Sequence, residues 1–235
     1  NTGTTTTNVT LNQSTSVLAN DLGTGLSVSS YDHTSIQNGS ITMQPNGTYV
    51  YVPPLNFSGT DSFHYTLVDT SGSHSTTLVS ITVTPKAVND TAITHANTTL
   101  IGSSVLANDT GSTLSVTAFD AISTQGGVVS MNSNGTYTYI PPNGFSGTDT
   151  FTYTATDSSG NMTTATVTIT VLPVAVNDSG STTANTVLNG SSVLSNDIGT
   201  DLYVSSYTHT STHGGTVVMQ SNGTYVYTPP AGFSG

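Results

Sequence analysis

The sequence predicts an all-β protein made of tandem β-sandwich domains, and three observations indicate this. The tetrapeptide Asn-Gly-Thr-Tyr begins at Asn46, Asn134 and Asn222, a constant step of 88 residues (134 − 46 and 222 − 134). A fixed period of this length is the mark of a tandem array of small domains. Glu is absent and Lys occurs once, whereas β-branched Thr and Val are abundant. This composition disfavours helix and favours strand throughout the chain.

The strands are predicted where apolar and polar residues alternate with period two. Short strands fit residues 26–31 and 40–43. The stretches Thr48–Val52 and Thr136–Ile140 each place two Tyr on one face. Phe151–Ala155 places Phe, Tyr and Ala on its inward face. Thr166–Val171 likewise places Val, Ile and Val on its inward face. These alternating aromatic side chains are expected to form the core rather than a sugar-binding face.

Turn residues separate these strands. Asn-Gly before Thr-Tyr predicts a tight hairpin, because both turn residues tolerate positive φ. The pairs Pro53-Pro54, Pro141-Pro142 and Pro229-Pro230 end strands, since Pro donates no ladder hydrogen bond. Asp69-Thr-Ser-Gly72 and Asp157-Ser-Ser-Gly160 predict a second hairpin. About seven short strands per repeat, without Trp or Cys, indicate an Ig-like sandwich that is not of the antibody type.

The period divides the chain into three units. They are expected at residues 1–86, 87–174 and 175–235, with Asn1 aligned to Asn89 and Asn177. The third unit is incomplete, because the counterparts of residues 148–174, which carry two core strands, are not in the sequence. We expect either that the natural chain continues or that another chain donates the strands. Continuation of the natural chain is favoured, because strand donation is the rarer arrangement.

The charge balance excludes several partners. Lys86 is the only basic residue, all twelve acidic residues are Asp, and the net charge is −11. Nucleic acids and anionic membrane surfaces are bound mainly through Lys and Arg, so neither is an expected partner. No apolar run is long enough to cross a bilayer, so no membrane insertion is expected.

The ordered blocks of the repeat resemble a known family. These blocks are Ala-Val-Asn-Asp at 87–90 and 175–178, Ser-Val-Leu-Ala-Asn-Asp at 104–109, Pro-Pro-Asn-Gly-Phe-Ser-Gly-Thr-Asp-Thr-Phe-Thr-Tyr at 141–153, and Asp-Ser-Ser-Gly at 157–160. Together they resemble the bacterial cadherin-like, tandem Ig-like repeats of large extracellular surface proteins and adhesins. The resemblance covers essentially the whole chain. It implies tandem cadherin-like sandwiches linked end to end in an extracellular, often calcium-stiffened array.

Calcium is the one cofactor that the sequence suggests. Asn89 and Asp90 lie at a domain junction, where they could act with Asp109 and with Asp69 of the preceding hairpin. Alternatively, Asn-Asp pairs cap turns by accepting backbone hydrogen bonds. The acidic Asp-x-Asp-Gly-Asp loop that the family commonly carries after Asn-Asp is missing here, which weakens the case for a site of six to eight oxygen ligands.

Asn-x-Ser/Thr sequons recur along the chain and predict exposed loops that a suitable host could glycosylate. The candidates are Asn46, Asn97, Asn134, Asn189 and Asn222. The alternative is that a chain rich in Asn and Thr contains sequons by chance.

No catalytic constellation recurs with the period, so we expect the protein not to be an enzyme. None of the six His residues repeats at the 88-residue step. Asp149 and Asp157, which do repeat as Asp61 and Asp69, lie beside turns and are interpreted as caps. A strand–turn–helix elbow for a nucleophile is also absent.

Two functions are compatible with these features. The first is a structural repeat module of a long extracellular fibre, sheath or adhesin stalk at the cell surface. It would act as a stiff, protease-resistant spacer, with other copies of the same protein as partners in a filament. The alternative is an adhesive module that recognises a sugar or a partner surface protein. Because every distinctive block is shared between repeats, the sequence favours the spacer.

Overall fold

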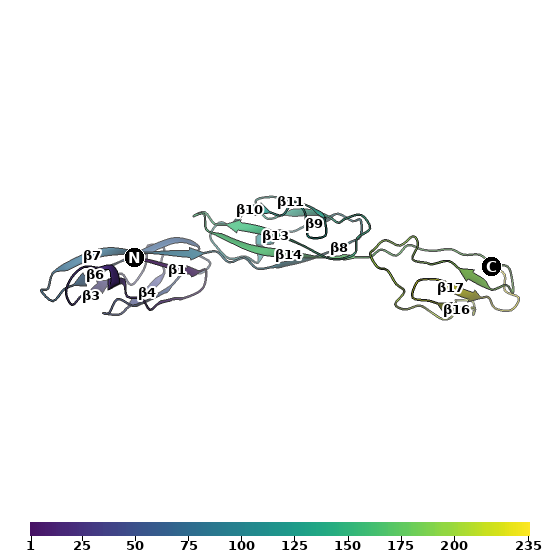
Figure 1. Ribbon diagram of the computed structural model, residues 1–235, viewed down its shortest axis with the longest axis horizontal. Coiled ribbons are helices and arrows are strands. Elements are labelled where there is room, and N and C mark those ends of the chain that lie inside the picture. The colour runs from purple at the N-terminus through teal and green to yellow at the C-terminus, as the bar shows by residue number, and fades with distance from the viewer.

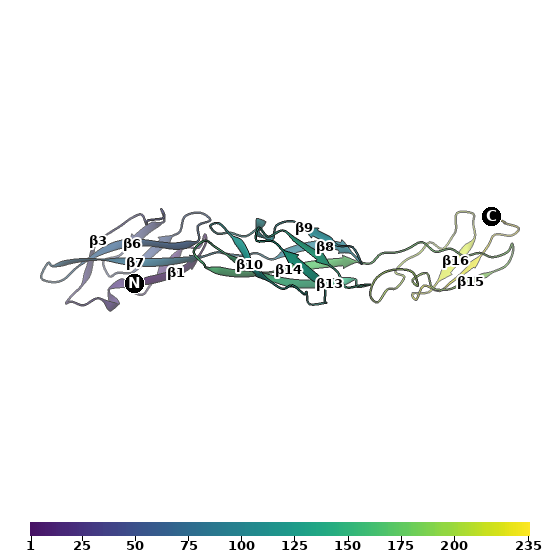
Figure 2. The ribbon, with the colours of Figure 1, turned by 90° about the horizontal axis from the view of Figure 1, so that it is seen from above.

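The computed structural model describes residues 1–235 and arranges them as three β-rich lobes in one extended row (Figure 1). The view from above shows the same row, with the N-terminus in the first lobe and the C-terminus in the third (Figure 2). Strands β1–β7 form the first lobe, β8–β14 the second and β15–β17 the third. The predicted all-β fold class is therefore confirmed.

The first lobe is a two-layer sandwich of seven strands. One sheet has the order β1-β7-β6-β3 and the other has the order β2-β5-β4. Strand β1 runs parallel to β7, and every other pairing is antiparallel. The strand bounds are β1 Thr2–Thr6, β2 Leu11–Gln13, β3 Ser27–Tyr31, β4 Ser40–Met43, β5 Tyr49–Val52, β6 Gly59–Val68 and β7 His74–Thr84.

The second lobe repeats this topology. Its sheets have the orders β8-β14-β13-β10 and β9-β12-β11, and β8 runs parallel to β14. The strand bounds are β8 Asp90–His95, β9 Leu100–Gly102, β10 Ser115–Phe119, β11 Val128–Met131, β12 Tyr137–Ile140, β13 Gly147–Thr156 and β14 Met162–Leu172. The Ig-like sandwich with about seven strands is thus present twice.

Each complete lobe also has one helical turn that the sequence did not predict. These 3-10 turns span Val17–Asn20 and Val105–Ala107. The hydroxyl oxygens of Ser16 and Ser104 cap them by accepting from a backbone N–H two residues on. Val17 and Val105 are buried at the end of each core.

The core of each lobe is formed by the inward residues of the alternating strands, as predicted. In the first lobe, Phe63, Tyr65 and Tyr51 are completely buried, and in the second lobe Phe151, Tyr153 and Tyr139 match them. Burial of each such side chain stabilises a fold by about 1.5–3 kcal/mol. One edge-on aromatic pair crosses each core, with ring centroids 5.3 Å apart for Tyr49–Phe63 and 5.4 Å apart for Tyr137–Phe151.

The pairing registers correct the alignment of the first residues. Thr2 of β1 pairs with Ser80, whereas Thr91 of β8 pairs with Thr168. Since Ser80 and Thr168 are one period apart, the structural counterpart of Asn1 is Asp90 and not Asn89. One extra residue between Gln13 and Ser16 restores the 88-residue step further along the chain.

The third lobe has a single sheet, β15-β17-β16, with bounds Leu188–Gly190, Tyr225–Thr228 and Thr216–Met219. The segments that correspond to β8 and β10, residues 178–183 and 203–207, form no strand. In the second lobe these strands pair with β14 and β13, whose counterparts are absent from this sequence. Tyr225 and Tyr227 are accordingly only half-buried, whereas Tyr139 is fully buried.

Candidate functional site at the domain junction

The segment between β7 and β8 joins the first two lobes and is hydrogen-bonded along its length. Lys86 N donates to Thr110 O at 2.8 Å, and Thr110 N donates to Lys86 O at 2.9 Å. Val88 N donates to the Asp109 carboxylate at 2.8 Å. The second junction repeats this pattern with Val174, Ile198 and Asp197. Each linker is therefore attached to the domain that follows it and is not a free tether.

Side chains also connect the two domains directly across each junction. Ser58, in the turn before β6, exchanges hydrogen bonds with Ser112, in the loop before β10. Ser146 and Thr200 make the corresponding exchange at the second junction. The contact is thus a feature of the repeat and not of one copy.

Tyr153, on β13, lies beside two acidic residues of the second domain and is hydrogen-bonded to one of them. The Tyr153 hydroxyl donates to Asp109, with oxygen–oxygen distances of 2.9 and 3.1 Å, and Oδ2 of Asp90 is buried without a hydrogen-bond partner. Burial raises the pKa of Asp90, and the charge of Asp109 raises it further. Burial likewise raises the pKa of Asp109 and, far above its usual range, that of Tyr153.

The first domain contains the same arrangement with one charge fewer. The Tyr65 hydroxyl donates to Asp21 at 2.6 Å, and the side-chain amide of Asn1 donates to the Tyr65 oxygen at 2.8 Å. Asn1 occupies the position that Asp90 has in the second domain. The second domain therefore places two carboxylates around one tyrosine hydroxyl, which has a single proton to donate.

The four residues proposed from sequence as calcium ligands do not come together. Asp90 and Asp109 lie near Tyr153, but the Asn89 side-chain oxygen accepts from Thr166 N at 3.0 Å. Asp69 lies in the β6–β7 turn, at the other end of β7 from the junction (Figure 1), and accepts from the N–H groups of Ser71 and Ser73. Its inclusion in the site was wrong. Its counterpart Asp157 lies in the β13–β14 turn of the following domain, and Ser159 of that turn approaches Gly59 of the first domain.

The donor chemistry at the junction does not fit calcium. Calcium takes about six to eight oxygen ligands, several of them carboxylate. The side-chain oxygen of Asn89 and both carboxylate oxygens of Asp109 already accept hydrogen bonds, which leaves Asp90 as the one carboxylate there whose oxygens are not already taken by Val88, Tyr153 or Thr166. No group of three or more acidic or His side chains is gathered in a metal-binding arrangement.

Asp149 has a larger role than the predicted turn cap. It is completely buried and accepts from Tyr139 Oη at 2.7 Å, from Gln125 N at 2.8 Å and from the Ser123 hydroxyl. Burial acts to raise its pKa, but these hydrogen bonds outweigh burial and lower it. Asp61 makes the equivalent bonds in the first domain. The two aspartates connect β13, or β6, to the opposite sheet, and the alternation of the strand alone does not reveal this role.

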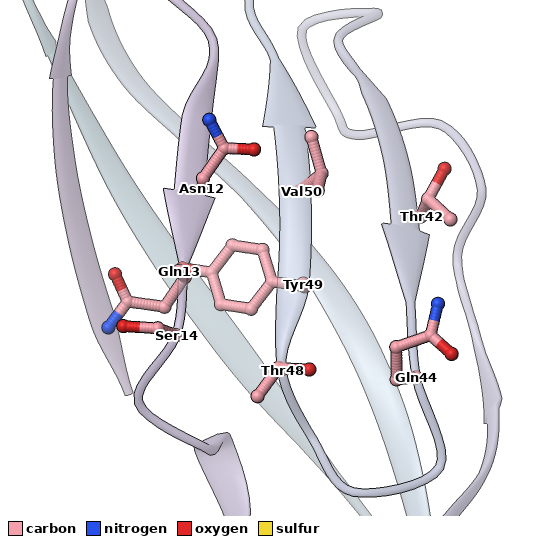
Figure 3. Close-up of a pocket in the computed structure, with 8 residues that line it drawn as sticks. All are labelled: Asn12, Gln13, Ser14, Thr42, Gln44, Thr48, Tyr49 and Val50. Carbon is pink, nitrogen blue, oxygen red and sulfur yellow. The ribbon is translucent and has the colours of Figure 1, made fainter.

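A shallow groove lies on the outer face of the first domain (Figure 3). It has a volume of about 290 Å³ and lies over β2, β4 and β5. Asn12 and Thr42 flank Val50 in it, and the amide of Gln44 lies level with Thr48. In the second domain, Ile101 and Thr138 replace Asn12 and Val50 in the paired register, so the chemistry of the groove does not repeat.

The predicted glycosylation residues all lie on the surface. Asn46, Asn134 and Asn222 are exposed at hairpin turns, where each side-chain oxygen accepts from the Thr two residues on. Asn97 is exposed with a positive φ of 59°, and Asn189 is exposed in β15. Glycosylation at these positions stays a prediction.

The paired sheets and the repeated junction define the chain as a tandem array of Ig-like β-sandwich domains. The chain belongs to the bacterial Ig domain family, whose model matches residues 83–170 and 171–235, and residues 1–85 match the bacterial cadherin-like domain. Such repeats are typical of extracellular surface proteins. The expected family resemblance is thereby confirmed.

Solved structures with a similar arrangement include cadherin ectodomains. The EC1-4 fragment of Drosophila N-cadherin is 17% identical, with 98% of this chain and 64% of that chain covered and a TM-score of 0.33. Human CDH23 EC21-23 is 13% identical, with 97% and 92% covered and a TM-score of 0.32. The endo-fucoidan hydrolase MfFcnA9 of glycoside hydrolase family 107 is 16% identical, with 61% and 28% covered and a TM-score of 0.26.

At these identities and TM-scores the likeness carries no argument about function. The chain spans less than two thirds of the N-cadherin fragment and of the hydrolase. No curated protein sequence matches the chain. None of its helical segments has the length and hydropathy needed to span a bilayer.

Proposed function

We propose that this chain is a spacer segment of a long extracellular fibre, sheath or adhesin stalk at the cell surface. The observation that carries the proposal is the recurrence of one junction. Both linkers are hydrogen-bonded to the following domain, and both junctions have an exchange between two hydroxyl residues, Ser58 with Ser112 and Ser146 with Thr200. Domains joined in this way extend in one direction, as the row in Figure 1 does. The function is mechanical: the row of domains sets the distance between the parts of the protein that it joins.

The proposed partners are other copies of the same repeat protein. A surface with net charge −11 and one basic residue offers no complement to nucleic acid or to an anionic membrane. Self-association in a filament instead needs matching ends, which a repeat provides because its two ends are complementary.

Catalysis is not part of the proposal. The Ser29 hydroxyl lies 3.3 Å from Nδ1 of His74, but the pair is exposed and the second domain has Thr117 and Met162 at these positions. The deeply buried carboxylates Asp61 and Asp149 are occupied by hydrogen bonds within the fold.

Electron microscopy of the native material and X-ray scattering of the chain test the spacer role. We expect a rod that lengthens by about 35–45 Å per repeat, given strands that rise about 3.3 Å per residue, and an ordered fibre with an axial repeat of that size. A compact globule in scattering, or domains at random angles, would contradict a spacer.

The groove in Figure 3 favours the second candidate function, adhesion to a sugar or a surface protein. Glycan-array binding that is lost in Asn12→Ala and Gln44→Ala variants would support adhesion. Its absence would leave the spacer role alone.

A further inference from the structure

Only one residue lies between the hydrogen-bonded backbones of the first two domains. Thr7 N, in the first domain, donates to Thr84 O at 2.8 Å, and Lys86 N donates to Thr110 O of the second domain at 2.8 Å. Pro85 is the residue between these two bonds. The part of the linker that belongs to neither domain is therefore a single proline.

The second junction has the same arrangement. Ala96 N of the second domain donates to Leu172 O at 2.7 Å, and Val174 N donates to Ile198 O of the third domain at 2.8 Å. Pro173 is again the one residue between the two bonds. The single-proline linker thus recurs with the period of the repeat.

A proline at this place leaves few free rotations between the domains. The ring of Pro85 fixes its φ at about −65° and confines the preceding residue, Thr84, to extended backbone. The hydrogen bonds on either side hold the flanking residues in their own domains. The ψ angle of Pro85 and the φ angle of Lys86 are then the main torsions that can change the angle between the domains.

The loop before β10 packs against this proline. A Cβ added to Gly111 would lie 2.8 Å from Pro85 Cβ and 3.0 Å from Ser58 Oγ of the first domain. A Cβ added to Gly199 would lie 2.9 Å from Pro173 Cβ in the same way. Because carbon atoms pack at about 3.5–4.0 Å from one another, only a glycine lets the loop approach the linker this closely.

Reciprocal hydrogen bonds between hydroxyl residues restrain the remaining torsions. Ser58 N donates to Ser112 Oγ at 3.0 Å, and Ser112 N donates to Ser58 Oγ at 2.9 Å. At the second junction, Ser146 N donates to Thr200 Oγ1 at 3.1 Å, and Thr200 N donates to Ser146 Oγ at 2.8 Å. The replacement of Ser by Thr leaves the exchange intact, so the exchange needs a hydroxyl and not one particular side chain.

The β13–β14 turn adds a further contact at the first junction. A Cβ added to Gly59 would lie 2.9 Å from Ser159 Oγ, so this turn touches the first domain. Asp157 in the same turn is buried, and the Ser58 hydroxyl is among its hydrogen-bond donors. Ser58 itself is 2% exposed. The linker, the loop and the turn therefore form one continuous contact between the two domains.

We propose that Pro85 and Pro173, held by these contacts, fix the angle between neighbouring domains without a bound cation. The contacts on each proline and its loop are made by neutral hydroxyl, backbone and carbon atoms, and the carboxylates of the junction do not fit calcium. The proposal deepens the proposed spacer role, because a spacer needs the same fixed angle at every junction.

The length of the linker explains why a small contact suffices. Two domains that share a small polar interface usually move against each other when a flexible linker joins them. A linker of one proline keeps Ser58 and Ser112 side by side, so that their hydrogen bonds form within one molecule at a high effective concentration. The proline and the hydroxyl exchange therefore act together, and the loss of either should loosen the junction.

The distance distribution between two spin labels measures the angle and its spread. The chain has no Cys, so Thr76→Cys and Thr164→Cys place labels at equivalent exposed positions of β7 and β14. We expect a narrow distribution centred at about 35–45 Å, the length of one repeat. Neither EDTA nor added calcium should change its width.

Variants at the proline and at the hydroxyl exchange should widen this distribution. Pro85→Gly should about double its width, because the substitution frees φ of the linker. The double variant Ser58→Ala/Ser112→Ala should also widen it, because both hydroxyl acceptors are lost. Ser112→Thr should keep it narrow, since Thr200 makes the same exchange at the second junction.

Pro45→Gly is the matched control. Pro45 is exposed in the β4–β5 turn, so this variant removes a proline from the first domain without changing the junction. It should lower the melting temperature and leave the distribution narrow. If Pro85→Gly and the double Ser variant both keep the natural width, the proposal is overturned. A natural chain whose distribution widens in EDTA or narrows with calcium would overturn it as well.

The fixed junction and the spacer role can fail separately. If the labelled chain behaves as expected but the native material contains no extended fibre or stalk, the fixed junction stands and the spacer role falls. If the native material is an ordered fibre but the isolated chain gives a broad distribution, the spacer role stands, and contacts between chains supply the stiffness.

Discussion

The side chain of Thr7 destabilises its own domain, because its buried hydroxyl is unpaired. It is 1% exposed, and its hydroxyl has no hydrogen-bond partner, whereas the second domain has Ala96 at the matching position. Thr5, two residues earlier, is similarly buried but donates to Val9 O at 2.8 Å. An unsatisfied buried hydroxyl costs about 1–3 kcal/mol.

We expect Thr7→Val to stabilise the first domain by about 1 kcal/mol, because the substitution keeps the shape and removes the unpaired hydroxyl. A domain of this size should then melt about 4–8 °C higher in calorimetry. Thr5→Val is the control and should lower the melting temperature, since it leaves the Val9 carbonyl without its donor. Equal shifts of the same sign in both variants would show that hydroxyl pairing is not the cause.

Asp90 gives a prediction about pH. Its pKa is raised in the folded protein, so its contribution to stability is present at low pH and is lost as pH rises through the folded pKa. Asp90→Asn removes this loss and reproduces the single-charge arrangement of Asn1 in the first domain. We expect the variant to melt about 2–5 °C higher than the natural chain at pH 7, with a difference that vanishes near pH 3.

Calorimetry at several pH values measures the effect of Asp90→Asn. Asp120→Asn is a suitable control, because hydrogen bonds from Thr152 lower the pKa of Asp120 and the sign should reverse. A stabilisation by Asp90→Asn that is the same at pH 3 and at pH 7 would exclude charge as the reason.

At the scale of elements, the buried aspartate of β13 connects the two sheets. Asp149 accepts from Tyr139 on β12 and from the loop that carries Ser123 and Gln125. Strand alternation alone would place an apolar residue here, and a hydrophobic pattern cannot show that a carboxylate is fully bonded. Only the packing of one sheet on the other therefore explains why the residue at this position is a carboxylate.

Because the pKa of Asp149 is lowered in the fold, its stabilisation is present above its ordinary pKa of about 3.9 and is lost as pH falls through the lower folded value. We expect Asp149→Asn to destabilise the second domain by about 2–4 kcal/mol at pH 7, since bonds to a charged acceptor are replaced by weaker ones. Acid titration followed by circular dichroism should show a smaller pH dependence in the variant. A variant with the same acid midpoint as the natural chain would contradict this role.

At the scale of the whole molecule, the row of domains leaves almost no site for a trypsin-like protease. Lys86 is the only basic residue, and its N–H and C=O both pair with Thr110. A protease must bind its substrate in an extended form, which this pairing prevents.

We expect the folded chain to resist trypsin for hours at 25 °C and to be cut once, after Lys86, when heated above the melting temperature. Mass spectrometry would then find two fragments, residues 1–86 and 87–235. A Ser75→Lys variant controls for protease activity, because its new site is exposed beside a hairpin turn. Rapid cleavage of the native chain at Lys86 would show that the junction opens.

The local sequence by itself determined the number of repeats, the turns and the hairpin around each Asn-Gly turn, whereas residues 178–183 and 203–207 form no strand because their partner strands are absent. Alternation fixes which residues of a strand face inward, and Asn-Gly and Pro-Pro fix where strands end, because these effects act over a few residues. The family resemblance and the aromatic cores of Tyr51, Phe63, Tyr139 and Phe151 followed from the same local signals.

Only the tertiary structure decided which residues meet across domains. Three features depend on such long-range geometry. They are the β1–β7 pairing that equates Asn1 with Asp90, the separation of Asp69 from the junction by the length of a strand, and the exchange between Ser58 and Ser112, which are 54 positions apart. Such contacts depend on how sheets stack and how domains follow one another, and no short-range pattern encodes that geometry.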